Sequence, residues 1–354
     1  MGSVYESVIR PVLFRGDAEL AHERAIGWLK MMGRFGPAIR MMEHYNRPRH
    51  GEPIELFGLS FPNAVGLAAG FDKNALCWNV MGAFGFGHVE IGTVTRHDQP
   101  GNQRPRLSRI PEHEALINRM GFPNDGAEAI AKRLAKRAGS KRRGIPIGIN
   151  IGKSKPTPLD QATPEYIETF NILADFADYF AINVSSPNTP ELRRLQEADF
   201  LRQLLGELNK TNAERARKLG KERIPMLVKI APDLSFREID SILEVVQDVG
   251  FDGIIATNTM IERPVDLGGK DEAGGLSGKP IIQRSSQIIR YMHLATKGKL
   301  PIIGVGGVTD AKSAGQLFDS GASLVQLYTG MVYRGPFFAK DIAQALVWRS
   351  AEWV

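Results

Sequence analysis

The sequence predicts an α/β fold, a (β/α)8 TIM barrel with a small N-terminal helical cap domain. Two observations predict the barrel. Eight apolar runs with strand character alternate with eight helical stretches, and polar or glycine-rich residues follow each run, where a barrel places its functional groups. A doubly wound sheet is the alternative. It is disfavoured because the first strand opens into GLAAGFDK and not into a GxGxxG turn.

The composition bounds the class of protein. Of the 354 residues, 43% are hydrophobic, 24% are charged and one is cysteine, so we expect a globular protein in a reducing compartment, without a disulfide framework. The net charge of +6 sits in short basic clusters, at 132–143, Arg193-Arg194 and 215–223, that look like solvated helix faces and loops. They lack interleaved aromatic residues, so no nucleic-acid partner is expected. No apolar run spans a bilayer and no signal peptide is visible, which predicts a soluble or peripheral protein.

Residues 1–45 form the predicted cap domain. Apolar residues recur at near-helical spacing from Val4 to Phe14. Asp17 is placed to cap a second helix from Leu20 to Met32, which Gly36-Pro37 ends. The segment is either a helical cap packed on the main domain or a lid whose apolar inner face touches lipid or an apolar ligand. Periodicity alone favours the plain cap.

Residues 46–354 form the predicted barrel domain. A linker and a β-hairpin from Ile54 to Phe61 precede the first barrel strand. The predicted strands are 64–69, 88–94, 146–151, 179–184, 225–230, 253–257, 301–305 and 324–327. The predicted helices lie near 73–83, 125–138, 164–177, 200–219, 235–249, 280–295, 310–320 and 336–348. In a barrel, the carboxyl ends of the eight strands then face one another around a single site.

The end of the fourth predicted strand, AINVSSPNTP at 181–190, carries four short polar side chains, Asn183, Ser185, Ser186 and Asn188. Taken alone, it fits a turn whose side chains bond their own backbone and a loop that binds a small planar polar molecule equally well. Its place in a ring of polar strand ends favours the binding loop. The ring offers no metal-ligand spacing and no carboxylate pair for glycoside hydrolysis.

Glycine-rich turns predict a phosphate site. The stretch 304–308 ends the seventh strand before a helix, 328–330 ends the eighth strand, and 274–278 precedes another helix that could close over the same phosphate. Lys229 ends the fifth strand, where it could place a positive charge beside the pyrimidine end of a flavin. The phosphate site, the amide side chains and the lysine together suggest FMN as the cofactor. The alternative for Lys229 is a salt bridge with a neighbouring loop carboxylate.

A series of motifs runs in order from about residue 54 to residue 336. They are NAVGLAAGFDKN, VEIGTVT with the later PGNQRPRLSR, INRMGFPNDG, IGINIGKSK, INVSSPNTPELRRLQ, LVKIAPDL, ATNTM, GGLSGKP, PIIGVGGV and LVQLYTGMVYRGP. These motifs closely resemble class 2 dihydroorotate dehydrogenase, the membrane-associated, quinone-dependent enzyme of pyrimidine synthesis. Class 1 relatives have cysteine where this chain has Ser186, so the serine and the N-terminal helical segment both favour class 2.

The resemblance implies the residues of the site. It assigns FMN to Ala69, Gly70, Lys73, Thr93, Asn150, Asn183, Lys229, Thr257, Gly278, Gly307, Tyr328 and Thr329. It assigns dihydroorotate to Lys73, Asn118, Arg119, Met120, Gly121, Phe122, Asn183, Asn188, Asn258 and Thr259. Ser186 matches the catalytic base of the family. No metal is implied.

The implied activity is oxidation of (S)-dihydroorotate to orotate, with FMN as hydride acceptor and a membrane quinone as terminal acceptor. The cap would form an apolar tunnel from the membrane to the flavin, with His22, Arg109 and Tyr328 along it, and its helices would rest on an anionic lipid surface. A monomer is expected, peripheral on the cytoplasmic face of the cell membrane if bacterial. The alternatives are another FMN barrel that reduces a pyrimidine or uridine with NADPH, and a barrel that only senses a nucleotide.

Overall fold

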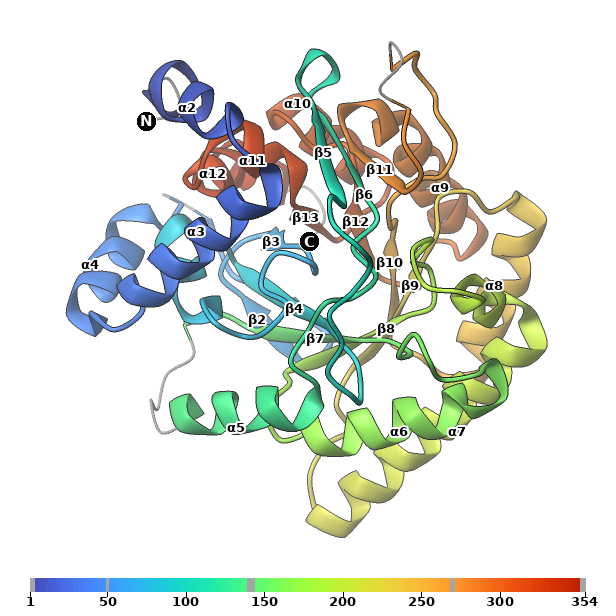
Figure 1. Ribbon diagram of the computed structural model, residues 1–354. Coiled ribbons are helices and arrows are strands. Elements are labelled where there is room, and N and C mark those ends of the chain that lie inside the picture. Colours follow the sequence, from blue (N-terminus) through green and yellow to red (C-terminus); the bar gives the residue numbers. More distant parts are fainter. Residues whose placement is uncertain (1–3, 49–50, 139–143, 268–270, 351–354) are drawn as a thin grey trace.

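A computed structural model describes residues 4–48, 51–138, 144–267 and 271–350. Figure 1 looks along a barrel, with the N-terminal helices (blue) on one side of its mouth. Residues 139–143, the end of the basic cluster at 132–143, lie outside the described part of the chain.

Eight parallel strands close into a barrel, which confirms the predicted fold class. They are β3 (Val65–Leu67), β4 (His88–Val94), β7 (Ile147–Ile151), β8 (Tyr179–Asn183), β9 (Met226–Ile230), β10 (Gly253–Ala256), β12 (Ile302–Val305) and β13 (Leu324–Leu327). The strands are rich in Val, Ile and Leu and are buried, as expected of parallel strands that helices cover. Their register sets Asn183 beside Lys229, so two residues of the predicted site are neighbours across β8 and β9.

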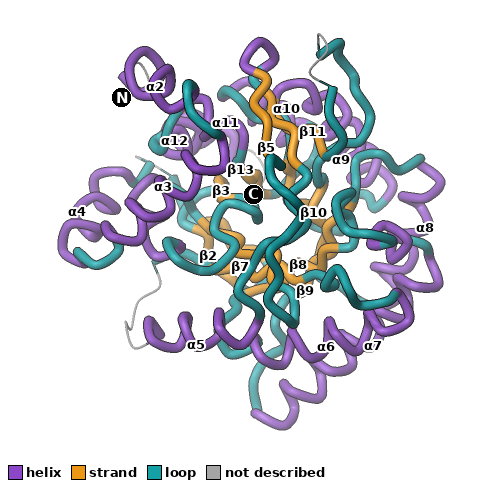
Figure 2. The backbone as a smooth tube through the Cα atoms, in the orientation of Figure 1, coloured by secondary structure: helices purple, strands orange, loops and turns teal. Residues whose placement is uncertain are grey.

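Helices surround the ring of strands (Figure 2). They are α5 (Ala127–Ala138), α6 (Ala162–Leu173), α7 (Ala198–Leu219), α8 (Phe236–Val249), α9 (Ile282–Ala295), α10 (Ala311–Asp319), α11 (Thr329–Arg334) and α12 (Phe338–Ser350). All but α11 were predicted. Ser235 and Asp310 are the N-caps of α8 and α10, and each forms a capping box. This local signal made the starts of these two helices predictable from the sequence.

The prediction of a helix at 73–83 is wrong. A turn follows β3 instead, and a 3₁₀ helix, η2 (Trp78–Phe84), comes later. The buried carboxylate of Asp72 accepts hydrogen bonds from the backbone N–H groups of Leu76 (2.7 Å) and Cys77 (2.8 Å). These bonds offer the backbone a partner other than a helix, so the turn is held in place.

A second sheet, which was not predicted, lies over the C-terminal ends of the barrel strands (Figure 1). It contains β5 (Leu107–Ile110), β6 (Ala115–Asn118) and β11 (Gly275–Gly278), all antiparallel. The glycine-rich stretch 274–278 was expected as a turn before a helix. It is mostly a strand paired with β6, and a 3₁₀ helix, η6 (Lys279–Ile281), then leads into α9.

The predicted hairpin is present as β1 (Ile54–Leu56) and β2 (Leu59–Phe61). It covers the opposite end of the barrel, where the rings of Phe61 and His88 meet edge to face with centroids 5.4 Å apart. The functional end of the barrel is therefore the end that faces the N-terminal helices and the second sheet.

The N-terminal segment forms a π-helical turn, η1 (Tyr5–Ile9), and three helices, α2 (Arg10–Phe14), α3 (Ala18–Met32) and α4 (Gly36–Asn46). Asp17 caps α3 as predicted, because its carboxylate accepts the Leu20 N–H at 2.8 Å. Gly36-Pro37 separates α3 from α4 and begins the latter, a position that suits proline.

Glu19 anchors α3 to the barrel domain. Its buried carboxylate lies 2.7 Å from the buried guanidinium of Arg106, which precedes β5. The N-terminal segment also has exposed apolar side chains, among them Val12, Trp28 and Phe35. Within the residues that the structure describes, none of the helices has both the length and the apolar character that a membrane crossing requires.

Candidate active site

Most residues predicted for the site line one cavity at the C-terminal ends of the barrel strands. They are Ala69, Gly70, Lys73, Thr93, Asn118, Met120, Gly121, Phe122, Asn183, Ser186, Asn188, Lys229, Thr257, Asn258, Thr259, Gly278, Gly307, Tyr328 and Thr329. His22 of α3 also reaches this cavity. The barrel topology therefore brings together residues that are far apart in the sequence, as the prediction required.

Two predicted residues do not line the cavity. Arg119 turns outward, where its guanidinium pairs with Glu272 at 2.7 Å and donates to the carbonyl of Pro105 at 2.7 Å. Asn150 is fully buried behind the wall of the cavity. Its side-chain oxygen, Oδ1, accepts hydrogen bonds from the side chains of Thr93 and Asn183. Arg119 is thus placed to hold the second sheet, and Asn150 to orient residues that do line the cavity.

The cavity also has lining residues that the resemblance did not assign to a ligand. They are Ala68, Leu107, Leu116, Ser277, Ile281, Val305, Gly306, Val308, Gln326 and Gly330. Several belong to the glycine-rich turns already singled out for phosphate. Gln326 had a signal of its own, as the one polar residue in the strand LVQL. Leu107 and Leu116 had none, because they come from the sheet that the sequence did not reveal.

The loop after β8 holds Ser186 in the cavity wall. The backbone N–H of Asn188 donates to the Ser186 hydroxyl oxygen at 3.2 Å, which fixes the direction of that oxygen. Ser185 does not line the cavity. Its hydroxyl donates to Asn183 Oδ1 at 3.1 Å and accepts from Asn258 Nδ2 at 3.0 Å, so it ties the end of β8 to the end of β10.

The amide side chains of the site are held in fixed directions. Asn188 Nδ2 donates to the side-chain and backbone oxygens of Asn118, both at 3.1 Å. Asn183 Nδ2 donates to Thr93 Oγ1 at 2.9 Å and to Asn150 Oδ1 at 3.2 Å. An amide with one edge fixed in this way presents its remaining groups to a ligand in a defined orientation.

Lys73 brings a positive charge to the cavity. Burial lowers the pKa of Lys73 to about 8, with Arg106 acting in the same direction and Glu19 and Asp72 opposing it. The ammonium group donates to the backbone carbonyl of Gly70. Lys73 is therefore still mainly a cation at pH 7, which suits an anionic group on a ligand.

Lys229 forms a buried ion pair with Glu90, with 3.0 Å between Nζ and Oε1. The salt bridge considered for Lys229 is thus present, but its carboxylate comes from strand β4 and not from a loop. Glu90 also accepts hydrogen bonds from Asn150 Nδ2 and Gln326 Nε2, both at 2.8 Å. Gln326 lines the cavity, and its buried Oε1 has no hydrogen-bond partner in the described structure.

We expect Lys229→Met to lower the free energy of unfolding by about 3–5 kcal/mol at pH 7, because Glu90 would keep a buried charge without its cation. The double variant Lys229→Met/Glu90→Gln removes both charges and should recover most of that loss. Urea unfolding of the three proteins measures the difference. Equal destabilisation in the single and double variants would contradict the assignment of this pair.

Glycine turns form the other end of the cavity. Gly306 and Gly307, which follow β12, have φ values of 113° and 87°, and Gly278 at the end of β11 has a φ of 97°. A Cβ at Gly307 would lie 2.4 Å from the Cα of Ile282, so the turn can pass this close to α9 only with glycine there.

Two hydroxyls stand beside these turns. Ser277 Oγ and Thr329 Oγ1 are 2.8 Å apart, at the end of β11 and the start of α11. Glycine turns, hydroxyls and helix starts are the groups that bind phosphate in many barrels. With Lys229 and Gln326 also lining the cavity, the residues present fit a planar cofactor that carries a phosphate.

A second, mainly apolar cavity of about 740 Å³ lies between the N-terminal helices and the barrel. It adjoins the first, because His22 and Tyr328 line both. Arg109 also lines it, with its guanidinium 4.6 Å from the centroid of the Phe14 ring. The three residues predicted for a tunnel therefore lie around one cavity that reaches the candidate active site.

The two of these residues that line both cavities, His22 and Tyr328, are uncharged at pH 7. Burial, and then the charge of Lys73, lower the pKa of His22 to about 3. Burial raises the pKa of Tyr328 to about 12. A neutral imidazole and a neutral phenol can each offer a hydrogen bond to an uncharged polar ring without a desolvated charge beside it.

Comparison with known proteins places the chain in a family. The Dihydroorotate dehydrogenase family model matches residues 53–349. A protein named dihydroorotate dehydrogenase (quinone) from Chloroflexus aurantiacus is 49% identical over 355 residues, which cover 98% of this chain and 97% of the relative. One of the same name from Salinispora arenicola is 49% identical over 351 residues, covering 97% and 98%.

Solved structures agree with these relatives. The ligand-free type DHODH from Eimeria tenella superposes with a TM-score of 0.84 at 37% identity, covering 93% of this chain and 94% of that one. The complex of DHODH with ferulenol from the same organism has a TM-score of 0.83 at 36% identity, covering 93% and 90%. As the motifs implied, the chain belongs to the dihydroorotate dehydrogenase family.

Proposed function

We propose that this protein oxidises (S)-dihydroorotate to orotate and passes the electrons through FMN to a membrane quinone, in pyrimidine biosynthesis. The observation that carries the proposal is the junction of two cavities. The polar cavity, which is the more polar of the two and has the glycine turns and fixed amides, meets the apolar cavity at His22 and Tyr328. An enzyme with this reaction needs such a junction, because a polar substrate and an apolar quinone must reach the same cofactor.

FMN would occupy the polar cavity, which has Lys229 at one end and the glycine turns at the other. The residues that would hold it are Ala69, Gly70, Lys73, Thr93, Asn183, Lys229, Thr257, Gly278, Gly307, Tyr328 and Thr329, with Asn150 acting from behind. When bound, FMN supplies the acceptor for the hydrogen and the two electrons that leave the substrate. The unpaired Gln326 oxygen adds an acceptor that suits a ring N–H group.

Dihydroorotate would bind against the fixed amides, with its carboxylate near the Lys73 cation. Asn118, Asn188 and Asn258 line the cavity, where Asn118 Nδ2 keeps one N–H that can donate to a ring oxygen and Asn188 Oδ1 can accept from a ring N–H. Ser186 would take the proton from C5 of the substrate. A serine hydroxyl is a weak base, so it would pass its own proton to solvent as it takes the proton from C5, and the hydrogen bond from the Asn188 N–H would hold its oxygen in place.

The cap domain, residues 1–45, would carry the quinone to the cofactor. The apolar cavity with His22, Arg109 and Tyr328 is large enough for a ring ligand. Exposed apolar side chains on these helices, interspersed with Arg10, Arg24 and other cations, suit contact with an anionic lipid surface. We expect a peripheral monomer on the cytoplasmic face of the membrane if the source is bacterial.

We expect kcat/KM for dihydroorotate to fall above about pH 8, because Lys73 then loses the charge that pairs with the substrate carboxylate. A lowered pKa leaves the cation present below that pH and absent above it. Lys73→Arg keeps its charge at high pH, so in this variant the fall should move to higher pH. The measurement is the rate of flavin reduction by dihydroorotate in both proteins across the alkaline pH range. If the rate of the wild-type protein does not change with pH in this range, the proposed role of Lys73 is contradicted.

The direct test of the proposed function is the absorbance of the purified protein. It should be yellow, dihydroorotate should bleach it, and a soluble quinone should restore the colour. Bleaching by NADPH and not by dihydroorotate would favour a reductase of pyrimidines or uridine. A colourless protein that does not take up added FMN would contradict any flavin enzyme.

A further inference from the structure

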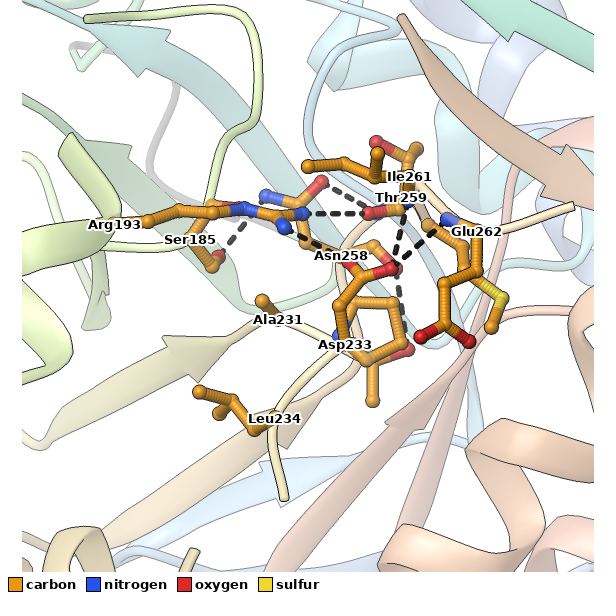
Figure 3. A network of polar contacts seen from close by, with 12 residues as sticks. Ser185, Arg193, Ala231, Asp233, Leu234, Asn258, Thr259, Ile261 and Glu262 are labelled. Atoms are coloured by element: carbon orange, nitrogen blue, oxygen red, sulfur yellow. Dashed lines mark hydrogen bonds and ion pairs between the residues drawn. The ribbon is translucent and has the colours of Figure 1, made fainter. Parts of the chain in front are cut away.

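Arg193 lies at the centre of a polar network that joins three strand-end loops (Figure 3). It belongs to a 3₁₀ helix, η5 (Leu192–Gln196), just after the Ser186 loop. A solvated helix face was expected for Arg193-Arg194, and for Arg193 this is wrong. Its side chain is 22% exposed, whereas that of Arg194 is 50% exposed and pairs with two glutamates nearby on the surface.

The guanidinium of Arg193 holds two backbone carbonyls at once. Its Nε donates to the carbonyl of Ser185 at 3.1 Å, and Nη2 donates to the carbonyl of Thr259 at 3.2 Å. Its third nitrogen, Nη1, lies 2.8 Å from the carboxylate of Asp233, in the loop after β9. One side chain therefore bridges the loops that follow β8, β9 and β10.

Asp233 extends the same network. Its side chain is 14% exposed, and its Oδ1 accepts the backbone N–H groups of Ile261 at 2.8 Å and Glu262 at 3.2 Å. The backbone after β10 is thus held at two points, by Arg193 at Thr259 and by Asp233 two and three residues later. This leaves the Thr259 loop little freedom to move relative to the Ser186 loop.

The two carbonyls that Arg193 holds belong to neighbours of the residues proposed for the chemistry. Ser185 precedes Ser186, and Thr259 follows Asn258. We propose that Arg193 and Asp233 are positioning residues for dihydroorotate oxidation, which set the separation between the Ser186 loop and the Asn258 loop. Neither lines the cavity, so they act through these loops. The proposal rests on the proposed function, since it concerns how base and amide reach one substrate molecule together.

Only arginine can make this set of contacts. A guanidinium presents donors in a rigid plane, so it can fix the angle between two carbonyls as well as their distance. A lysine at the same place keeps the charge near Asp233 but has a single flexible donor group. Arg193→Lys therefore removes the geometry and keeps the charge.

In the Arg193→Lys holoenzyme we expect the rate of flavin reduction at saturating dihydroorotate to fall by about 100-fold, because a misplacement near 1 Å costs a reaction about that much. Reoxidation of the reduced flavin by a soluble quinone should stay within about twofold of wild type, since it uses the other cavity. Asp233→Asn keeps an acceptor for Ile261 and loses the charge, so a smaller fall in the same step is expected. Arg194→Lys, one position along, is the matched control and should reduce at the wild-type rate.

The proposal is overturned if Arg193→Lys reduces its flavin as fast as Arg194→Lys. It is equally overturned if reduction, reoxidation and the unfolding midpoint fall together, which would mean a role in stability alone. Should Arg193→Lys not fold, Asp233→Asn carries the test with the same readouts. A wild-type flavin that dihydroorotate does not bleach is a different result, since it rejects the proposed function itself.

Discussion

Replacement of Ser186 by alanine is expected to slow flavin reduction by dihydroorotate about 100- to 10,000-fold near pH 7, the range that a general base contributes. The hydroxyl of Ser186 is the proposed base for the C5 proton, and the Asn188 N–H donates to its oxygen at 3.2 Å. Alanine removes that oxygen and leaves the glycine turns and Lys229 as they are. The variant should therefore be purified yellow, and single-turnover absorbance should show bound flavin that bleaches slowly.

Ser185→Ala is the matched control, because it makes the same chemical change one residue earlier. It removes two hydrogen bonds, to Asn183 and from Asn258, and leaves the proposed base intact. We expect a loss of about tenfold or less, the equivalent of one or two ordinary hydrogen bonds. If Ser186→Ala reduced its flavin at the wild-type rate, Ser186 would not be the base. If Ser185→Ala were as slow as Ser186→Ala, the effect would belong to the loop and not to the hydroxyl.

The barrel could be predicted because its signals are local and repeated. Each strand is an apolar run that ends in a polar turn, and capping residues such as Ser235 and Asp310 mark where helices begin. The ring of strand ends then follows from topology alone. The same reasoning predicted that Lys73, Ser186, Asn183, Asn188 and Asn258 lie around one cavity, and they do, whereas Asn150 lies behind its wall.

What the sequence did not reveal depends on contacts between distant segments. Glu90, Lys229 and Gln326 come from three strands, and only the barrel interior makes them one network. Within the second sheet, the pairing of β6 with β11 joins residues more than 150 positions apart, so no short-range pattern could predict that pairing. A polar residue inside an apolar strand is the usable signal, and both Glu90 in HVEIGTV and Gln326 in LVQL carry it.

Arg193 is a single residue whose surroundings could not be predicted from the sequence, for the same reason. Two adjacent arginines look alike in the sequence, yet one is braced between three loops and the other pairs with glutamates at the surface. Charge runs predict solvent exposure on average, but the partner of each side chain is set by the fold. An arginine close after a catalytic loop is therefore a candidate for bracing, even inside a basic cluster.

Deletion of residues 1–42 would test the cap domain poorly, because the cap also supports the polar cavity. Glu19 is the buried partner of Arg106, and its removal would leave that guanidinium without a carboxylate. Arg106 also donates to the carbonyl of Asn102, whose amide in turn donates to the carbonyl of Asn188. Loss of the cap would thus disturb substrate binding together with quinone access.

Filling the apolar cavity is the sharper experiment. Ala18, Ala21 and Ala25 line it from one face of α3, where their small side chains leave room for a ring ligand. We expect Ala21→Trp/Ala25→Trp to lower quinone-dependent turnover by about 100-fold or more, because the quinone can no longer come into contact distance. Reduction by dihydroorotate should stay near wild type, since Glu19 and its ion pair with Arg106 remain.

Leu20→Trp is the control for this variant. Leu20 is 43% exposed, is next to Ala21 in the chain and does not line the cavity, so the same indole there should leave quinone turnover unchanged. Stopped-flow absorbance separates the two half-reactions in each protein. Normal reoxidation in Ala21→Trp/Ala25→Trp would mean that quinone reaches the flavin by another route. A parallel loss in both half-reactions would mean that the two indoles shift α3 as a whole. The loss of quinone turnover could then not be attributed to a blocked tunnel.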